Sequence, residues 1–296
     1  MKRVCKRKIQ IDALTVCYEM QNPYLYEELS NLEYGERYDV CEFWVVCTKA
    51  RYFNHAFTIW LNNGENDIVF GTLKYDIAGG NETSNKFPNG MRKVWISLDN
   101  AALYGDDIHN IFYIEQMLGL NFHNTTCLDL CLDTPFCIAN QIKTYIHKSD
   151  VTTILNGKRI KDRDADRPEI SYVYSGSLNN QNKYLTVNVK QKDAIKDKTK
   201  GVTVTIYDKK TEVANSSGKQ YVLDYYGNPK SLYRTEVHLN NEDVNDYIKR
   251  TGTDNSPLLY VNDEVIEDMF FYFLGSVIRF QSKSTDVSWR HILGRS

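Results

Sequence analysis

Three segments in the second half of this 296-residue chain alternate apolar and polar residues almost without a break. They are residues 126–133, 202–210 and 231–239. Successive side chains of a β-strand point to opposite faces of a sheet, so a period of two predicts three strands with one apolar and one polar face each. A sheet built from such strands packs one face on the core and leaves the other open, as antiparallel sheets commonly do.

The first of these segments carries two carboxylates on its polar face. Asp129 lies between leucines in the middle of the segment, and Asp133 ends it just before Thr134 and Pro135. Aspartate is depleted in strands, so two on one face indicate a functional role. For Asp133, a solvated strand end is an equally good explanation.

The second segment places Tyr207 and Lys209 on one face, with Asp208, Lys210 and Glu212 close by in sequence. The chain has 21 tyrosines, so most of them must be structural, and Tyr207 stands out only because a lysine shares its face. A phenol has a pKa near 10 and needs a cation or a metal to act as an oxyanion nucleophile.

The third segment aligns Arg234, Glu236 and His238 on one face. A carboxylate and an imidazole placed in this way are ligand types for Mg²⁺ or Mn²⁺, of which Mn²⁺ tolerates imidazole better. A surface ion pair between Arg234 and Glu236 is the simpler alternative. If the three strands are neighbours, their polar faces combine into a metal site beside a tyrosine, which suits phosphoryl transfer to a hydroxyl nucleophile.

The rest of the sequence predicts an α+β protein with a mainly antiparallel β-sheet and helices on one face, and hints at two related halves. Further strands are expected at residues 9–16, 41–47, 56–61, 67–74, 93–98, 170–174 and 184–189, and helices at 106–118, 136–147 and 257–280. The predicted division is an N-terminal α+β half at 1–120, a catalytic half at 121–250 and a C-terminal helical segment at 251–296.

Several common catalytic motifs are absent from the sequence. It has no GxxxxGK[ST] loop, no GxGxxG and no HExxH, which argues against an NTPase, a Rossmann oxidoreductase and a zincin. Cys127 and Cys131, with Cys137 and His123 nearby, do not predict a zinc site. Four residues along a strand separate two cysteines by about 13 Å, whereas zinc lies about 2.3 Å from each thiolate.

Charge is segregated along the chain although its net value is only 36 − 38 = −2. Residues 143–163 and 190–210 each carry a net charge of +4, and residues 241–270 carry −6. The basic stretches can form phosphate-binding patches, so the near-neutral total does not exclude a DNA partner. Seven cysteines fit reduced thiols, and the basic N-terminus has no apolar signal core behind it, so a cytoplasmic location is expected.

Taken in order, these segments resemble the rolling-circle replication initiator family of plasmids, filamentous phages and integrative elements. That family shows an R-x-D-x-x-x-D strand, a Tyr-Gly-Ser segment, a Y-D-K-x-x-E strand and an R-x-E strand. The counterparts here are residues 127–133, 174–177, 207–212 and 234–236.

The resemblance implies a Rep/HUH-like nickase architecture and an initiator that nicks origin DNA at a specific site. Tyr207 would attack the phosphodiester, form a 5′-phosphotyrosine link and leave a 3′-OH primer for rolling-circle replication. Lys209 would stabilise the phenolate or the scissile phosphate. The implied partners are origin DNA, either single-stranded or supercoiled duplex, a helicase and a second copy of the chain, with no membrane.

The resemblance also implies a ligand set for a divalent metal, Mg²⁺ or Mn²⁺. Asp129 and Glu236 would be ligands, and His238 or Asp133 would assist them. Tyr172, Tyr174 and Tyr184 are the reserve candidates for the nucleophile.

The predicted DNA contacts are Arg234, Lys183, Lys190 and Lys210. Lys183, Lys190 and Arg234 would replace basic residues that the family has and this chain lacks, because Cys127, Leu178 and Thr205 stand at positions where a basic residue is common. These departures leave alternatives open: a conjugative relaxase of the same chemistry, a non-catalytic DNA-binding regulator on the same scaffold, or a structural protein whose polar strand faces are merely solvated.

Overall fold

The computed structural model describes residues 8–62, 67–105, 107–160, 166–175, 184–197 and 199–294. The chain forms two compact units. The Tyr207 unit takes its described residues from Met1–Gln10, Asp129–Thr253 and Asn262–Ser296, and the N-terminal unit from Ile11–Leu128 and Asp254–Val261. Both units are discontinuous along the chain, because residues 254–261, which include the 3₁₀ turn η3 (Pro257–Val261), belong to the N-terminal unit and the chain then returns to the Tyr207 unit.

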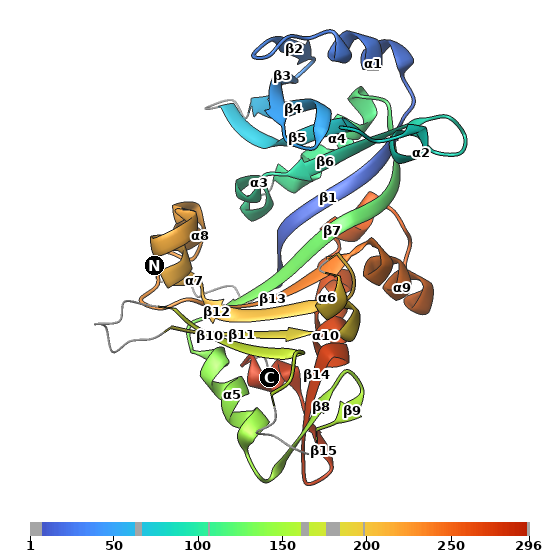
Figure 1. Cartoon of the computed structure of the whole chain (residues 1–296). Coiled ribbons are helices and arrows are strands. Elements are labelled where there is room, and N and C mark those ends of the chain that lie inside the picture. Colours follow the sequence, from blue (N-terminus) through green and yellow to red (C-terminus); the bar gives the residue numbers. More distant parts are fainter. Residues whose placement is uncertain are drawn as a thin grey trace. The chain divides into compact units, whose positions relative to one another are not determined.

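The Tyr207 unit contains an antiparallel array of strands in the order β10-β11-β12-β13-β7 and a small sheet in the order β15-β14-β8-β9 (Figure 1). The strand bounds are β7 (Leu120–Thr134), β8 (Val151–Leu155), β9 (Lys158–Arg159), β10 (Ile170–Ser175), β11 (Tyr184–Lys190), β12 (Thr203–Asp208), β13 (Tyr233–Asn240), β14 (Ile278–Ser282) and β15 (Thr285–Val287). Strand β7 crosses the boundary between the units, and only its residues from Asp129 onward belong to this one. The helices are α5 (Ile138–His147), α6 (Lys192–Lys196), α7 (Lys209–Glu212), α8 (Gln220–Tyr225), α9 (Asn241–Thr251), α10 (Asp263–Val277) and α11 (Trp289–Ile292), and a π-helical turn, η2 (Val213–Ser217), joins α7 to α8.

The apolar faces of the three alternating strands form the core of this unit. Val204, Ile206 and Val237 are completely buried. Helix α5 contacts β11, β12 and β13, and α10 contacts β12 and β13. The period-two pattern therefore predicts the two faces correctly. The apolar side of the sheet packs against helices, and the opposite side carries the polar residues.

The N-terminal unit is also an antiparallel sheet, in the order β1-β6-β5-β4-β3-β2. Its strands are β1 (Gln10–Met20), β2 (Arg37–Val40), β3 (Phe43–Ala50), β4 (Phe53–Asn62), β5 (Asp67–Ile77) and β6 (Arg92–Leu98). Its helical segments are α1 (Pro23–Ser30), α2 (Glu82–Asn85), α3 (Asn100–Tyr104), the 3₁₀ turns η1 (Asp107–His109) and η3 (Pro257–Val261), and α4 (Asn110–Met117).

The observed fold confirms the α+β class and the mainly antiparallel sheet. The helix expected at 257–280 is only partly right, because helix α10 ends at Val277 and the chain continues as strand β14. Ile278 and Phe280 alternate with more exposed residues and pair with β8, so tertiary pairing overrides the helical spacing there. Within the ranges that the structure covers, no helix is long and apolar enough to cross a membrane.

Candidate functional site: the open face of strands β7, β12 and β13

The register between β12 and β13 brings the predicted polar faces together. Thr203 lies opposite His238, Thr205 opposite Glu236, and Tyr207 opposite Arg234. Residues directly opposite each other in an antiparallel pair project from the same face. The side chains of Tyr207, Glu236 and His238 therefore share one face of the sheet, as the alternation predicted.

The hydroxyl of Tyr207 donates a hydrogen bond to Oε2 of Glu236 at 3.0 Å. Both side chains are half-buried. Lys209 is 2% exposed and forms an ion pair with Glu212, with 2.9 Å between Nζ and Oε2. Its Nζ also lies 5.7 Å from the centroid of the Tyr207 ring, within the range of a cation–π contact. The phenol thus has an acceptor for its proton and a cation near its ring.

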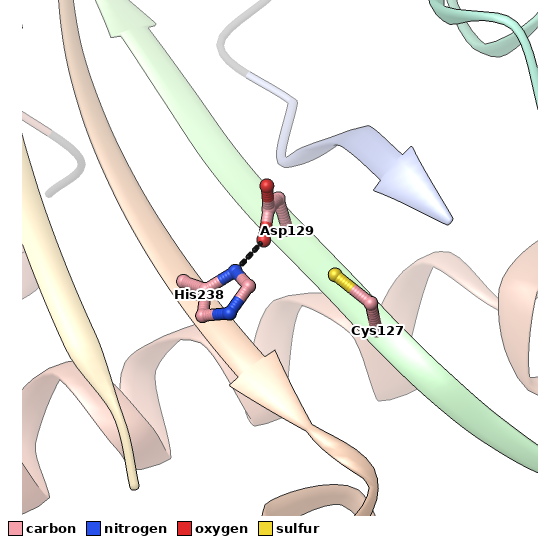
Figure 2. A group of neighbouring side chains, drawn as sticks. All are labelled: Cys127, Asp129 and His238. Atoms are coloured by element: carbon pink, nitrogen blue, oxygen red, sulfur yellow. Dashed lines mark hydrogen bonds and ion pairs between the residues drawn. The ribbon is translucent and has the colours of Figure 1, made fainter. Parts of the chain in front are cut away.

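Asp129 and His238 form the second part of the site. Nδ1 of His238 lies 2.5 Å from Oδ1 of Asp129, and the two side chains are 38% and 18% exposed respectively. Cys127 lies two residues before Asp129 on β7 and therefore faces the same way (Figure 2). Among the described residues, these three offer ligand atoms that all lie within 4.8 Å of one another.

The donor set of this cluster fits a divalent metal. An imidazole, a carboxylate and a thiol together suit Zn²⁺, whereas Mn²⁺ would use the carboxylate and the imidazole, and Mg²⁺ prefers oxygen ligands alone. The sequence reasoning missed Cys127 because it considered pairs of cysteines four residues apart. The signal that identifies it is the spacing of two between Cys127 and Asp129, which puts both side chains on one strand face.

Asp133 and Arg234, which the sequence predicted as site residues, have a structural role instead. Asp133 and Arg234 are bonded to each other, with 2.8 Å from Nε to Oδ1 and 2.6 Å from Nη2 to Oδ2. Both side chains are 0% exposed. A sealed bidentate pair offers no oxygen to a metal and no guanidinium to DNA. Arg234 is completely buried, so the alternative of an exposed surface pair with Glu236 does not describe it.

The remaining predicted residues are distributed differently. Glu236 lies outside the cluster of Cys127, Asp129 and His238, and its carboxylate binds Tyr207 instead. Lys190 is half-buried and lies opposite Thr203, so it shares the open face. Lys183 is outside the described residues.

Strand β12 ends at Asp208, so Lys210 lies on helix α7, and its Nζ donates hydrogen bonds to the carbonyl oxygens of Pro229 at 2.7 Å and Lys230 at 3.3 Å. The reserve nucleophiles Tyr172 and Tyr174 face the other side of the sheet, where Nζ of Lys143 on α5 binds the Tyr174 hydroxyl at 2.5 Å. They are therefore remote from Glu236 in the register of the strands.

No protein-family model matches the sequence, and no curated protein matches it either. The resemblance to rolling-circle initiators therefore remains a prediction drawn from motifs, and the proposal below depends on the geometry of the open face.

Proposed function

We propose that this protein is a site-specific DNA nicking and joining enzyme that initiates replication by tyrosine transesterification. The observation that carries the proposal is the hydrogen bond from Tyr207 to Glu236 on the same open face as the Asp129–His238 pair. A nucleophile, a base and a pair of metal-ligand side chains are what transfer of a phosphodiester to a hydroxyl group requires.

The proposed reaction begins when Glu236 accepts the proton of the Tyr207 hydroxyl. The phenolate oxygen forms a bond to phosphorus, and the bond between phosphorus and the 3′ oxygen breaks. The leaving oxygen takes a proton from solvent and becomes the 3′-OH primer. One phosphoester replaces another, so the link to Tyr207 conserves the energy of the broken bond for later rejoining.

Asp129 and His238, with Cys127 beside them, would hold a divalent metal in this proposal. Such a metal neutralises charge on the phosphodiester and makes the phosphorus easier to attack. Lys209, which is ion-paired with Glu212, places its ammonium group 5.7 Å from the centroid of the Tyr207 ring. Lys190 adds a cation on the same face for the DNA backbone.

The antiparallel array with its site on one open face supports a Rep/HUH-like architecture as part of the same proposal. Origin DNA is the proposed substrate, and a helicase and a second copy of the chain are the proposed partners. A conjugative relaxase would use the same residues, so the choice between the two depends on the DNA that is cut.

Covalent trapping tests the proposed function. The full-length protein is incubated with Mn²⁺ and an end-labelled single-stranded library, and with a negatively supercoiled plasmid library carrying random inserts. The DNA that becomes linked to protein is recovered and sequenced. We expect an adduct on a defined sequence, lost in Tyr207→Phe and reduced about 10²- to 10⁴-fold in Glu236→Gln, the range expected for loss of a general base.

Tyr174→Phe is the matched control, since it removes a hydroxyl from an exposed tyrosine on the other face of the sheet. It should form the adduct at the rate of the unmodified protein. An adduct that survives in Tyr207→Phe contradicts the assignment of the nucleophile. Sequence-specific binding without any adduct would instead support the non-catalytic regulator.

A further inference from the structure

A cavity of about 410 Å³ opens at the end of strand β12, one residue beyond Tyr207. Its walls come from the start of β11, from α7 with the following π-helical turn, and from the segment that leads into β13. All of these elements belong to the Tyr207 unit. The volume lies within the range of small-molecule sites, which is about 300–1,000 Å³.

Two tyrosines form the aromatic part of the lining, namely Tyr184 and Tyr233. Both are half-buried, so ring surface remains available to a ligand. Burial raises the pKa of Tyr233, and Cys137, Asp208 and Tyr184 raise it further. Its hydroxyl therefore stays protonated near neutral pH and can donate a hydrogen bond.

Cations and hydrogen-bonding groups line the rest of the cavity. Lys210 is held in place by its bonds to the carbonyl oxygens of Pro229 and Lys230, which use two of its three N–H donors. Lys230 is exposed at the cavity. Asp208 accepts the backbone N–H of Thr211 through Oδ1, and a carboxylate can accept further bonds.

This mixture fits a nucleotide. A base stacks on aromatic rings whatever its sequence, and its edge needs both donors and acceptors. A phosphate needs cations, which Lys210 and Lys230 supply. A paired base inside a duplex cannot enter a cavity of this kind, because its faces are already stacked on its neighbours.

The geometry points to this cavity as the binding site for one unpaired nucleotide of a single-stranded DNA, held at the end of strand β12. The inference rests on the proposed function for the identity of the strand. Asp208 follows Tyr207 directly in the strand, so their side chains leave it on opposite faces, and the cavity lies at the end of β12, not among the side chains of the open face that carry Tyr207. A nucleotide held there anchors the DNA at this end of the sheet and requires the DNA to be unpaired.

Direct binding tests the inference independently of cleavage. The full chain carrying Tyr207→Phe is titrated into a fluorescein-labelled random pool of single-stranded DNA, about 12 nucleotides long, and anisotropy is recorded. We expect Tyr233→Ala to weaken binding about 5- to 100-fold, the range for loss of one stacked base. Lys230→Ala should weaken binding and reduce its salt dependence by roughly one unit in the log–log slope.

Tyr24→Ala is the control, because Tyr24 is 78% exposed in the N-terminal unit and lies outside the cavity. It should bind the pool like the Tyr207→Phe parent. Circular dichroism checks the fold of every variant, and Lys230→Ala keeps the test valid if Tyr233→Ala does not fold, since Lys230 is on the surface.

Two results would overturn the inference. One is unchanged affinity in both Tyr233→Ala and Lys230→Ala. The other is binding of free deoxythymidine monophosphate as tight as that of the strand, which would make this a site for a free nucleotide. Absence of a covalent adduct in the trapping assay contradicts the proposed function alone, because this measurement needs no cleavage.

Discussion

Strands β7 and β13 carry two pairs of an aspartate with a basic side chain, and the two pairs differ in burial. Asp133 and Arg234 are both 0% exposed. Asp129 and His238 join the same two strands, but are 18% and 38% exposed. The two aspartates lie four residues apart on one face of β7, and the two basic residues lie four residues apart on one face of β13.

A polar residue on an open strand face is therefore not by itself a functional residue. The buried pair satisfies its own hydrogen bonds in a fork-to-fork geometry and fixes how β7 and β13 meet. Solvent reaches the other pair, so a metal or a phosphate can reach it too. Both pairs show the same sequence pattern, and only their burial distinguishes the structural pair from the pair that can take part in chemistry.

The largest expected effect comes from breaking the buried pair. Arg234→Ala should lower the free energy of unfolding by about 3–5 kcal/mol, because it leaves the carboxylate of Asp133 buried without its cation. Urea unfolding followed by circular dichroism measures this change. Arg250→Ala is the matched control: its ion pair with Asp246 is 62% and 58% exposed and should contribute about 0.5 kcal/mol or less.

A double replacement sharpens this result. Asp133→Leu with Arg234→Met removes both charges and retains side-chain volume, so it should recover most of the stability lost in Arg234→Ala. A double variant that is no more stable than Arg234→Ala would show that the loss comes from packing and not from an unpaired charge.

The open pair should behave in the opposite way. His238→Ala should change the free energy of unfolding by about 1 kcal/mol or less, since a partly exposed ion pair contributes little. The same variant should lose the stabilisation that Mn²⁺ gives, which for a metal at 100 times its Kd is about 2.7 kcal/mol. Differential scanning fluorimetry with and without Mn²⁺ measures both effects.

His291→Ala serves as the control for this prediction, because His291 is an exposed histidine on α11. It should keep the full shift of Tm with Mn²⁺. An equal shift in His238→Ala would remove His238 from the ligand set.

The sequence predicted the alternating strands and their polar faces, since alternation depends only on local geometry and on which face meets the core. It could not predict that Asp133 and Arg234 are buried, because burial depends on tertiary packing around the pair and not on the local pattern. It also missed helix α9, whose Asn240 and Asp243 form a capping box that was readable in the sequence. The hydrogen bond between Tyr207 and Glu236 depends on the register of β12 with β13, which a local sequence pattern does not contain.

The smallest expected change in stability concerns the carboxylate of Glu115 in the N-terminal unit, which is partly buried beside a neutral group. Glu115 on α4 accepts a hydrogen bond from the hydroxyl of Tyr18 at 2.7 Å. Burial raises the pKa of Glu115, and the bond from Tyr18 only partly offsets this rise. Asp133, by comparison, is buried together with a cation.

Since its pKa is higher in the folded state, folding favours the protonated form of Glu115. The stability that it contributes is fully present below the pKa of an unfolded glutamate, about 4.3, and is lost as the pH rises through the raised pKa of the folded state. Urea unfolding between these limits should show the free energy of unfolding falling with pH in the unmodified protein. Glu115→Gln keeps an acceptor for Tyr18 but cannot ionise, so its curve should lack this fall. If the free energy of unfolding depends on pH in the same way in both proteins, burial of the Glu115 carboxylate costs no more than burial of a neutral amide. The cation beside Asp133 would then not be needed to explain how these two carboxylates differ.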